Sequence, residues 1–314
     1  MVYVLLLIGF VLLIKGADIF VDGSVSIAEH FHIPSLIIGL TIIAFGTSAP
    51  EAAVSITAAI SGQNGIAVGN VIGSNIFNLL VVLGICALIK PCPIDGPTLK
   101  GEYPLSIFAA LAFVVLALTA FPGEPGLHLC RFDGIILLVI FTFFLFKTIR
   151  KSLASQIPEE SSPKGETSLS KAIFLSIIGL VGVIAGGQLV VSNASSIASS
   201  FGLSQTLIGL TIVSIGTSLP ELVTSAVAAT KGHTDIAIGN VIGSNLFNIL
   251  FVLGISVTIH PIQTEMISVY DGIILIVASI LVMIPFIIKK EIRRPWGFLF
   301  IAFYAVYMVY IIMR

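Results

Sequence analysis

The sequence predicts an all-α integral membrane protein with ten transmembrane helices in two inverted five-helix repeats. The composition is 57% hydrophobic and 10% charged, with a mean hydropathy of +1.12, which excludes a soluble domain. Apolar segments of membrane-spanning length recur along the chain. The hexapeptide GTSAPE at Gly46 to Glu51 also returns as GTSLPE at Gly216 to Glu221.

The number of spans follows from the length of the apolar segments. A helix needs about 20 apolar residues to cross the hydrocarbon core. Ten segments meet that length, at residues 3–28, 34–60, 66–90, 103–121, 131–149, 171–199, 205–230, 236–260, 268–288 and 296–313. The polar connection from Arg150 to Ser170 is typical of a flexible loop. We expect a first repeat at 1–149, a loop at 150–170 and a second repeat at 171–314.

The basic residues predict the orientation. If the ten spans alternate, twelve of the fifteen Lys and Arg residues fall on one side. Arg131 and Arg314 fall on the other side, and Lys15 lies within the first span. The positive-inside rule then places the loop at 150–170 in the cytoplasm and both termini outside, in a multi-pass plasma-membrane protein.

A repeat relates the two parts of the chain at a constant shift of 170 residues, the difference between Gly46 and Gly216. The matched pairs are Gly9/Gly179, Gly16/Gly186, Gly39/Gly209, Thr41/Thr211, Gly46/Gly216, Ser55/Ser225, Gly69/Gly239, Leu83/Leu253, Gly84/Gly254 and Pro91/Pro261. Because each repeat has an odd number of spans, the second must enter the membrane from the opposite side. Inverted repeats are characteristic of secondary transporters, which bind substrate at the repeat interface.

Each hexapeptide places a glutamate inside an apolar span, where a charge costs several kcal/mol and indicates a functional site. In a helix, Thr47 and Ser48 share a face with Glu51. Pro50 removes one amide hydrogen and disturbs the carbonyl of Gly46, so the helix should break there. The second copy repeats the pattern with Thr217, Ser218, Pro220 and Glu221.

A second doubled motif reads GNVIGSNIFN at Gly69 to Asn78 and GNVIGSNLFN at Gly239 to Asn248. Its polar residues recur every four positions and form one stripe per helix: Asn70, Ser74 and Asn78, and then Asn240, Ser244 and Asn248. The pairs Gly69 with Gly73 and Gly239 with Gly243 allow a neighbouring helix to approach closely. Helix packing would explain these stripes alone, but beside two intramembrane glutamates they indicate a site.

The ligand types predict a hard cation. Two carboxylates, two freed carbonyls, amides and hydroxyls supply the six to eight oxygens that calcium prefers. The cluster contains no histidine or cysteine, which argues against zinc, copper or iron. Magnesium fits less well because it dehydrates reluctantly.

The expected charge of the site favours exchange. Two buried carboxylates without a cation would leave uncompensated charge at a cost of several kcal/mol per ion. One calcium, two or more sodium ions or two protons would bring the site close to neutrality. Carrying one ion out therefore requires carrying another back.

The doubled GTSxPE and GNxxGSN motifs resemble the alpha repeats of the cation/calcium exchanger superfamily, and most closely those of its archaeal and bacterial sodium/calcium exchanger branch. The resemblance covers nearly the whole chain and implies a central diamond of four ion sites. It implies that Glu51 and Glu221 bind calcium with the backbone carbonyls of Thr47 and Thr217. Sodium ligands implied by the resemblance are Ala44, Thr47, Ser48, Ser74, Ser214, Thr217, Ser218, Ser244 and the two glutamates, with Asn78 and Asn248 at the central position.

The chain departs from that family pattern at Asn248, where the known archaeal exchangers have aspartate. Asparagine is nearly isosteric with a protonated aspartic acid but removes a titratable group. Sodium/calcium antiport is the leading hypothesis, and proton/calcium exchange on the same fold is the alternative. From another class, a calcium-permeable channel would also use acidic groups but would need no counter-ion.

An enzyme is not expected, because the chain lacks HExxH and a credible Ser/His/Asp set. We expect no cofactor beyond the transported calcium and sodium ions, and no partner other than those ions, protons and the lipid bilayer. Neither nucleic acid nor an obligatory protein partner is indicated. Lys15, Asp18 and Asp22 share one face of the first span, where a local ion pair is favoured over a role in transport.

Overall fold

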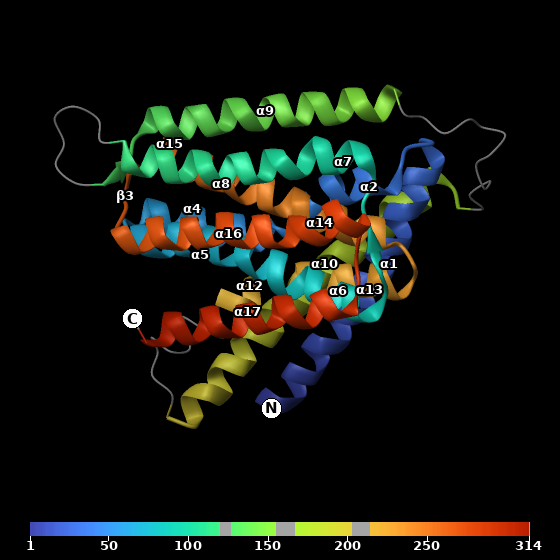
Figure 1. Cartoon of the computed structure of the whole chain (residues 1–314). Helices are drawn as coiled ribbons and strands as arrows, with labels where there is room; N and C mark the ends of the chain where they lie inside the picture. Colours follow the sequence, from blue (N-terminus) through green and yellow to red (C-terminus); the bar gives the residue numbers. More distant parts are fainter. Residues whose placement is uncertain (120–126, 155–166, 203–213, 314) are drawn as a thin grey trace.

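The computed structural model describes residues 1–119, 127–154, 167–202 and 214–313. Helices make up nearly all of the regular structure in these ranges (Figure 1). Within the described ranges, eight helices or continuous helical segments are long and apolar enough to cross a membrane. They are Val2–His30, Asn64–Ile89, Gly96–Leu118, Arg131–Leu153, Leu169–Ser200, Thr234–Ile259, Met266–Lys289 and Arg294–Met313.

A bent pair, Ser35–Thr47 and Ala49–Ile60, whose axes differ by 47°, brings the count in the described residues to nine if the pair is taken as one span. The tenth segment, expected at 205–230, begins in residues 203–213, outside the described part of the chain. Its described remainder consists of α12 (Ser214–Thr217) and α13 (Leu219–Thr230). The protein is therefore a helical membrane protein, and the ten-helix count stays a prediction.

Two short antiparallel ladders join connections between helices and were not expected from the sequence. Strand β1 (Cys92–Pro93) pairs with β4 (Glu291–Ile292), and β2 (His128–Leu129) pairs with β3 (Ile262–Gln263). Helices α6 (Leu83–Ile89) and α15 (Gly254–Ile259) stop before Pro91 and Pro261. The residue before each proline is extended, as proline sterics require, so the chain leaves each helix ready for strand pairing.

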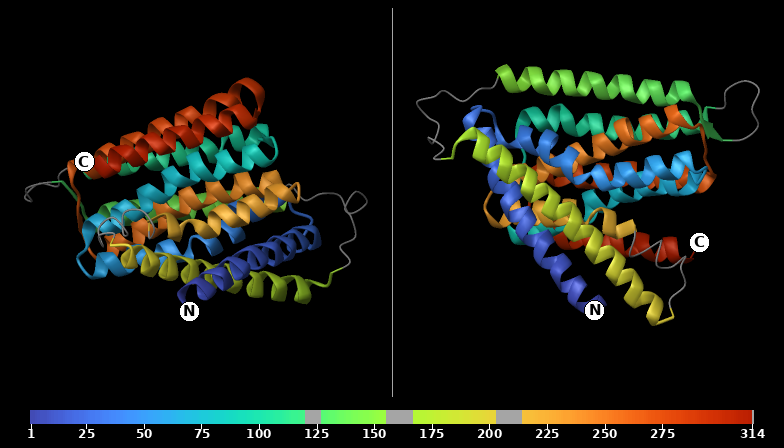
Figure 2. Two further views of the ribbon diagram at one scale, coloured as in Figure 1. Left: turned by 90° about the horizontal axis from the view of Figure 1, so that it is seen from below. Right: turned by 180° about the vertical axis from the view of Figure 1, so that it is seen from behind.

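Helices α1 (Val2–His30) and α10 (Leu169–Ser200) form a closely packed pair that lies obliquely to the other helices (Figure 2). Glycines allow this approach. A Cβ atom at Gly179 would lie 2.4 Å from the backbone nitrogen of Phe20, and one at Gly186 would lie 2.4 Å from that of Leu13. Since real Cβ atoms do not come so close, the repeated glycines of the two halves hold these backbones in contact.

Two helical segments form the most buried part of the structure. The first comprises α5 (Asn64–Phe77), a π-helical stretch η2 (Asn78–Val82) and α6; the second comprises α14 (Thr234–Leu246), π-helical η5 (Phe247–Leu253) and α15. The close approach expected at both glycine pairs is present at Gly239 and Gly243. Cβ atoms there would lie 2.5 Å from the carbonyl oxygens of Leu36 and Leu40, but a Cβ atom at Gly69 would have no described neighbour within 4 Å.

Four further long helices complete the described fold. The first three are α8 (Glu102–Leu118), which follows the short α7 (Gly96–Lys100), then α9 (Arg131–Ala154) and α16 (Met266–Lys289). The last helix, α17 (Arg294–Met313), ends on the side of the molecule opposite to the end of α9 (Figure 1). Most of their exposed side chains are large and apolar, as a lipid-facing surface requires.

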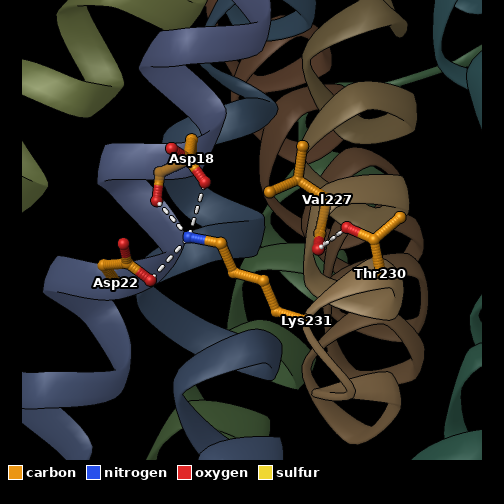
Figure 3. Close-up of polar contacts among 5 residues, drawn as sticks. All are labelled: Asp18, Asp22, Val227, Thr230 and Lys231. Carbon is orange, nitrogen blue, oxygen red and sulfur yellow. Dashed lines mark hydrogen bonds and ion pairs between the residues drawn. The ribbon is translucent and has the colours of Figure 1, made fainter.

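The prediction of a local ion pair on the first span is wrong in its partner. Lys231, which follows α13, lies 2.6 Å from a carboxylate oxygen of Asp18 and 2.6 Å from one of Asp22 (Figure 3). Lys15 is an exposed residue. The spacing along one helix could not reveal a cation contributed by the other half of the chain.

Candidate ion-binding site

The bent helix places the first glutamate. Helix α3 (Ala44–Thr47) ends at Ser48, and α4 (Ala49–Ile60) begins directly after it, with Pro50 in its first turn. Proline is tolerated in a first turn because the amide there has no helical acceptor. The break is repeated at Ser218, between α12 and α13, where Pro220 takes the same position. The predicted helix breaks are therefore confirmed at both motifs.

Both glutamates are fully buried, and each accepts a hydrogen bond from the opposite half of the chain. Ser218 Oγ donates to Glu51 Oε1 at 3.0 Å, and Ser48 Oγ donates to Glu221 Oε1 at 2.8 Å. The sequence indicated instead that Ser48 would share a face with Glu51. The break turns the serine toward the other half, so the two hexapeptides meet face to face.

The threonines of the motifs make the same kind of crossing contact. Thr47 Oγ1 donates to Asn240 Oδ1 at 3.1 Å, and Thr217 Oγ1 donates to Asn70 Oδ1 at 3.2 Å. The amide nitrogens of these asparagines donate within their own halves. Asn70 Nδ2 lies 2.9 Å from Ser55 Oγ, and Asn240 Nδ2 lies 2.9 Å from Ser225 Oγ.

Three more of the predicted ligands, Ser74, Ser244 and Ala44, lie in the same cluster. The hydroxyl oxygen of Ser74 lies 2.9 Å from that of Ser218. Ser244 Oγ lies 3.5 Å from both Glu221 Oε1 and the carbonyl oxygen of Ala44. Ser214 begins α12, but its side chain lies outside what the structure describes.

Asn78 and Asn248 are fully buried at or near the start of the π-helical stretches. Each amide nitrogen has a hydrogen-bond acceptor across the interface: Asn245 Oδ1 for Asn78, at 3.2 Å, and Asn75 Oδ1 for Asn248, at 3.1 Å. Their amide oxygens make no hydrogen bond to any described residue. π-Helical turns occur frequently at functional sites.

Four buried oxygens of this cluster therefore lack a hydrogen-bond donor among the described residues: Oε2 of Glu51, Oε2 of Glu221, and the Oδ1 atoms of Asn78 and Asn248. Buried polar atoms are normally paired, and each exception calls for an explanation. Two carboxylates and two amide oxygens form a hard, oxygen-only donor set. Such a set fits sodium or calcium.

Four asparagines of the cluster were absent from the predicted ligand set. Asn70 and Asn240 were identified only as part of the polar stripes, whereas Asn75 and Asn245 were not singled out. The available signal was the repetition of the letters GN and GSN in both copies. Their contacts across the two halves are visible only in the structure.

Comparison with known proteins gives a consistent family. The family model for sodium/calcium exchanger protein matches residues 1–150 and 171–313. The sodium/calcium exchanger MaX1 of Methanosarcina acetivorans is 32% identical, over 98% of this chain and 97% of its own. The inner membrane protein YrbG of Escherichia coli is 38% identical, over 82% of this chain and 79% of its own.

The solved structures agree with the sequence matches. A structure of the sodium-calcium exchanger NCX_Mj, soaked with 10 mM Na⁺ and no Ca²⁺, has a TM-score of 0.86 at 33% identity, over 98% of this chain and 99% of that one. A second, soaked with 2.5 mM Na⁺ and 0.1 mM Ca²⁺, has a TM-score of 0.83 at 34% identity, over 96% of each chain. This chain therefore belongs to the sodium/calcium exchanger family of membrane ion transporters.

Proposed function

We propose that this protein is a secondary antiporter that exchanges calcium for sodium by alternating access to a site built on Glu51 and Glu221. The observation that carries the proposal is the reciprocal pairing of Ser48 with Glu221 and of Ser218 with Glu51. One oxygen of each carboxylate is held by a serine, and the other has no donor among the described residues. That arrangement leaves one oxygen of each glutamate for a cation.

Electrostatics then couples the two ion movements. Two carboxylates without a cation would carry a charge that is costly to bury, so the empty site is a poor intermediate for changing sides. A calcium ion or two sodium ions would restore neutrality. In our proposal, the site changes sides readily only when loaded, and movement of calcium in one direction requires movement of sodium in the other.

We propose that the two halves, 1–149 and 171–314, are inverted repeats and that the site lies near the middle of the plasma membrane at their interface. Both termini would be outside and the loop at 150–170 in the cytoplasm. A cysteine introduced near Ser161 should react with an impermeant reagent only from the cytoplasmic side. A cysteine added beyond Arg314 should react only from outside. Labelling of both from one side would contradict the ten-span inverted arrangement.

The decisive experiment is calcium uptake into proteoliposomes loaded with sodium, with potassium, or with acidic buffer. We expect rapid uptake only with internal sodium. Uptake driven by a proton gradient alone would support the proton/calcium alternative. Uptake with no opposing gradient would indicate a calcium-permeable channel.

A further inference from the structure

Asn75 and Asn245 form a reciprocal contact where the two buried helical segments meet. Asn75 Nδ2 donates to the backbone carbonyl of Asn245 at 3.1 Å, and Asn245 Nδ2 donates to that of Asn75 at 3.3 Å. Both side chains are buried, at 0% and 3% exposure. Neither belongs to the predicted ligand set.

These backbone contacts fix the orientation of both side-chain amides. A carbonyl oxygen can only accept a hydrogen bond, so the atom facing it must be Nδ2. The Oδ1 atom of each amide therefore faces the other way. There it accepts from Asn248 Nδ2, in the case of Asn75, and from Asn78 Nδ2, in the case of Asn245.

The orientations of Asn75 and Asn245 in turn fix those of Asn78 and Asn248. Because Asn78 and Asn248 must present Nδ2 to these acceptors, each turns its Oδ1 away from them. Those are two of the four buried oxygens that lack a donor. A flipped amide would instead direct an NH₂ group toward the cation and would also lose its hydrogen bond across the interface.

We infer that Asn75 and Asn245 are positioning residues for ion binding. They hold the amides of Asn248 and Asn78 so that only oxygen faces the cation. The inference rests on the proposed ion site and extends it to two residues that contact no ion themselves. Each acts on an asparagine of the opposite half, not on the one three positions along its own helix.

The crossed pairing gives a test that a general structural role would not satisfy. Alanine is introduced at each of the four asparagines singly, in the crossed pairs Asn75 with Asn248 and Asn245 with Asn78, and in the same-helix pairs Asn75 with Asn78 and Asn245 with Asn248. The calcium KM of sodium-driven uptake is measured for each. Comparing each double variant with its two single variants, as in a double-mutant cycle, isolates the coupling between the two positions.

We expect Asn75→Ala and Asn245→Ala each to raise the calcium KM about five- to tenfold while changing the maximal rate much less, since a single oriented ligand is lost. A crossed double variant should be no worse than its poorer single variant, whereas the effects in a same-helix pair should multiply. Independent effects in the crossed pairs, or coupling within one helix, would overturn the inference.

Asn193→Ala is the matched control. Asn193 is also buried, but its amide donates within α10, to the carbonyl of Leu189 at 2.8 Å. Its calcium KM should stay at the parent value. If Asn75→Ala is not recovered as folded protein, Asn75→Ser takes its place in the cycle, because its shorter side chain no longer reaches Asn248 and the same coupling is expected.

A binding measurement separates this inference from the proposed exchange. The calcium-induced rise in melting temperature of the purified parent and variants gives the same couplings without transport. Crossed couplings in binding, with no sodium-driven uptake by the parent, would overturn the exchange and retain the positioning role. Sodium-driven uptake without crossed coupling would overturn the positioning role alone, and a parent with neither property would overturn both.

Discussion

The two halves of the chain, 1–149 and 171–314, make nearly the same hydrogen bonds in the buried cluster but differ in the ion pairs of Lys231. Five hydrogen bonds of the site recur at positions shifted by 170 residues. Their first-half donors are Thr47, Ser48, Asn70, Asn75 and Asn78, and their second-half donors are Thr217, Ser218, Asn240, Asn245 and Asn248. Four of the five kinds of contact cross from one half to the other. The duplicated motifs therefore form one shared cluster of hydrogen bonds, not two separate ones.

The ion pairs of Lys231 with Asp18 and Asp22 have no equivalent in this scheme. The matched residues in the other half are Ser61, Gln188 and Ser192, and none of them is charged. The contact joins α1 to the end of α13 (Figure 3). The buried cluster, where most polar groups need a partner, thus keeps the same contacts in both halves, while this partly exposed contact does not.

The largest effect should come from the glutamates. Glu51→Gln and Glu221→Gln should each reduce sodium-driven calcium uptake on the order of 100-fold or more, because each removes a charge that offsets the ion in a buried site. The two losses should be of similar size. Glu102→Gln, which changes a buried acid paired with Lys151, should keep the exchange activity. Near-normal uptake by either site variant would contradict the proposed site.

The next largest effect should come from an acid in place of Asn78 or Asn248. Asn78→Asp and Asn248→Asp should exchange calcium at low pH and lose activity at high pH more steeply than the parent. Only a protonated acid can donate the hydrogen bond that Asn245 and Asn75 accept, so ionisation would break it. Uptake would be measured from about pH 5.5 to about pH 8.5 with the proton gradient collapsed. A pH profile that changes in only one variant would show that the halves are not equivalent at this position.

The serines should give intermediate and unequal effects. Ser48→Ala and Ser218→Ala each remove a hydrogen bond to a carboxylate, worth about 1.5–3 kcal/mol, so the calcium KM should rise about tenfold or more. Ser218→Ala should be the more severe because Ser218 also contacts Ser74 at 2.9 Å. Ser61→Ala, in an exposed turn, is the control. Equal effects would mean that the Ser74 contact contributes nothing to ion binding.

The smallest effect should come from the ion pairs of Lys231, which have no equivalent in the other half. Burial alone would lower the pKa of Lys231, but its hydrogen bonds to Asp18 and Asp22 outweigh burial, so the pKa lies above the ordinary value. Stabilisation from a raised pKa is present at neutral pH and is lost as the pH rises through the folded-state value. Because all three groups are partly exposed, Lys231→Met should lower the melting temperature by only about 2 °C at low salt and less at high salt.

Two comparisons make the Lys231 result specific. Lys231→Arg keeps the charge and should melt close to the parent, and Ser61→Met, at the matched position of the first half, should have no salt-dependent effect. A loss of stability in Lys231→Met that is equally large at high salt would indicate lost packing, not a lost ion pair.

Much of the molecule follows from patterns within single segments. Eight spans and the bent pair lie where the apolar segments predict them. In lipid, a helix must form its own backbone hydrogen bonds and carry mostly apolar side chains along its length, so the apolar segments mark it. The breaks at Ser48 and Ser218 follow from Pro50 and Pro220. The sequence also singled out Glu51 and Glu221, since charges are costly in a membrane, and their role as ion ligands stays a prediction.

Only the tertiary structure decided which residues meet. Helical spacing placed Ser48 beside Glu51 and Lys15 beside Asp18, but the structure pairs Ser48 with Glu221 and Asp18 with Lys231. It also shows that Asn75 and Asn245 contact each other across the two halves. The spacing of residues in the sequence predicts only which side chains are neighbours on one helix. These partners lie roughly 170 to 210 residues apart in the chain and meet only when the two halves pack together.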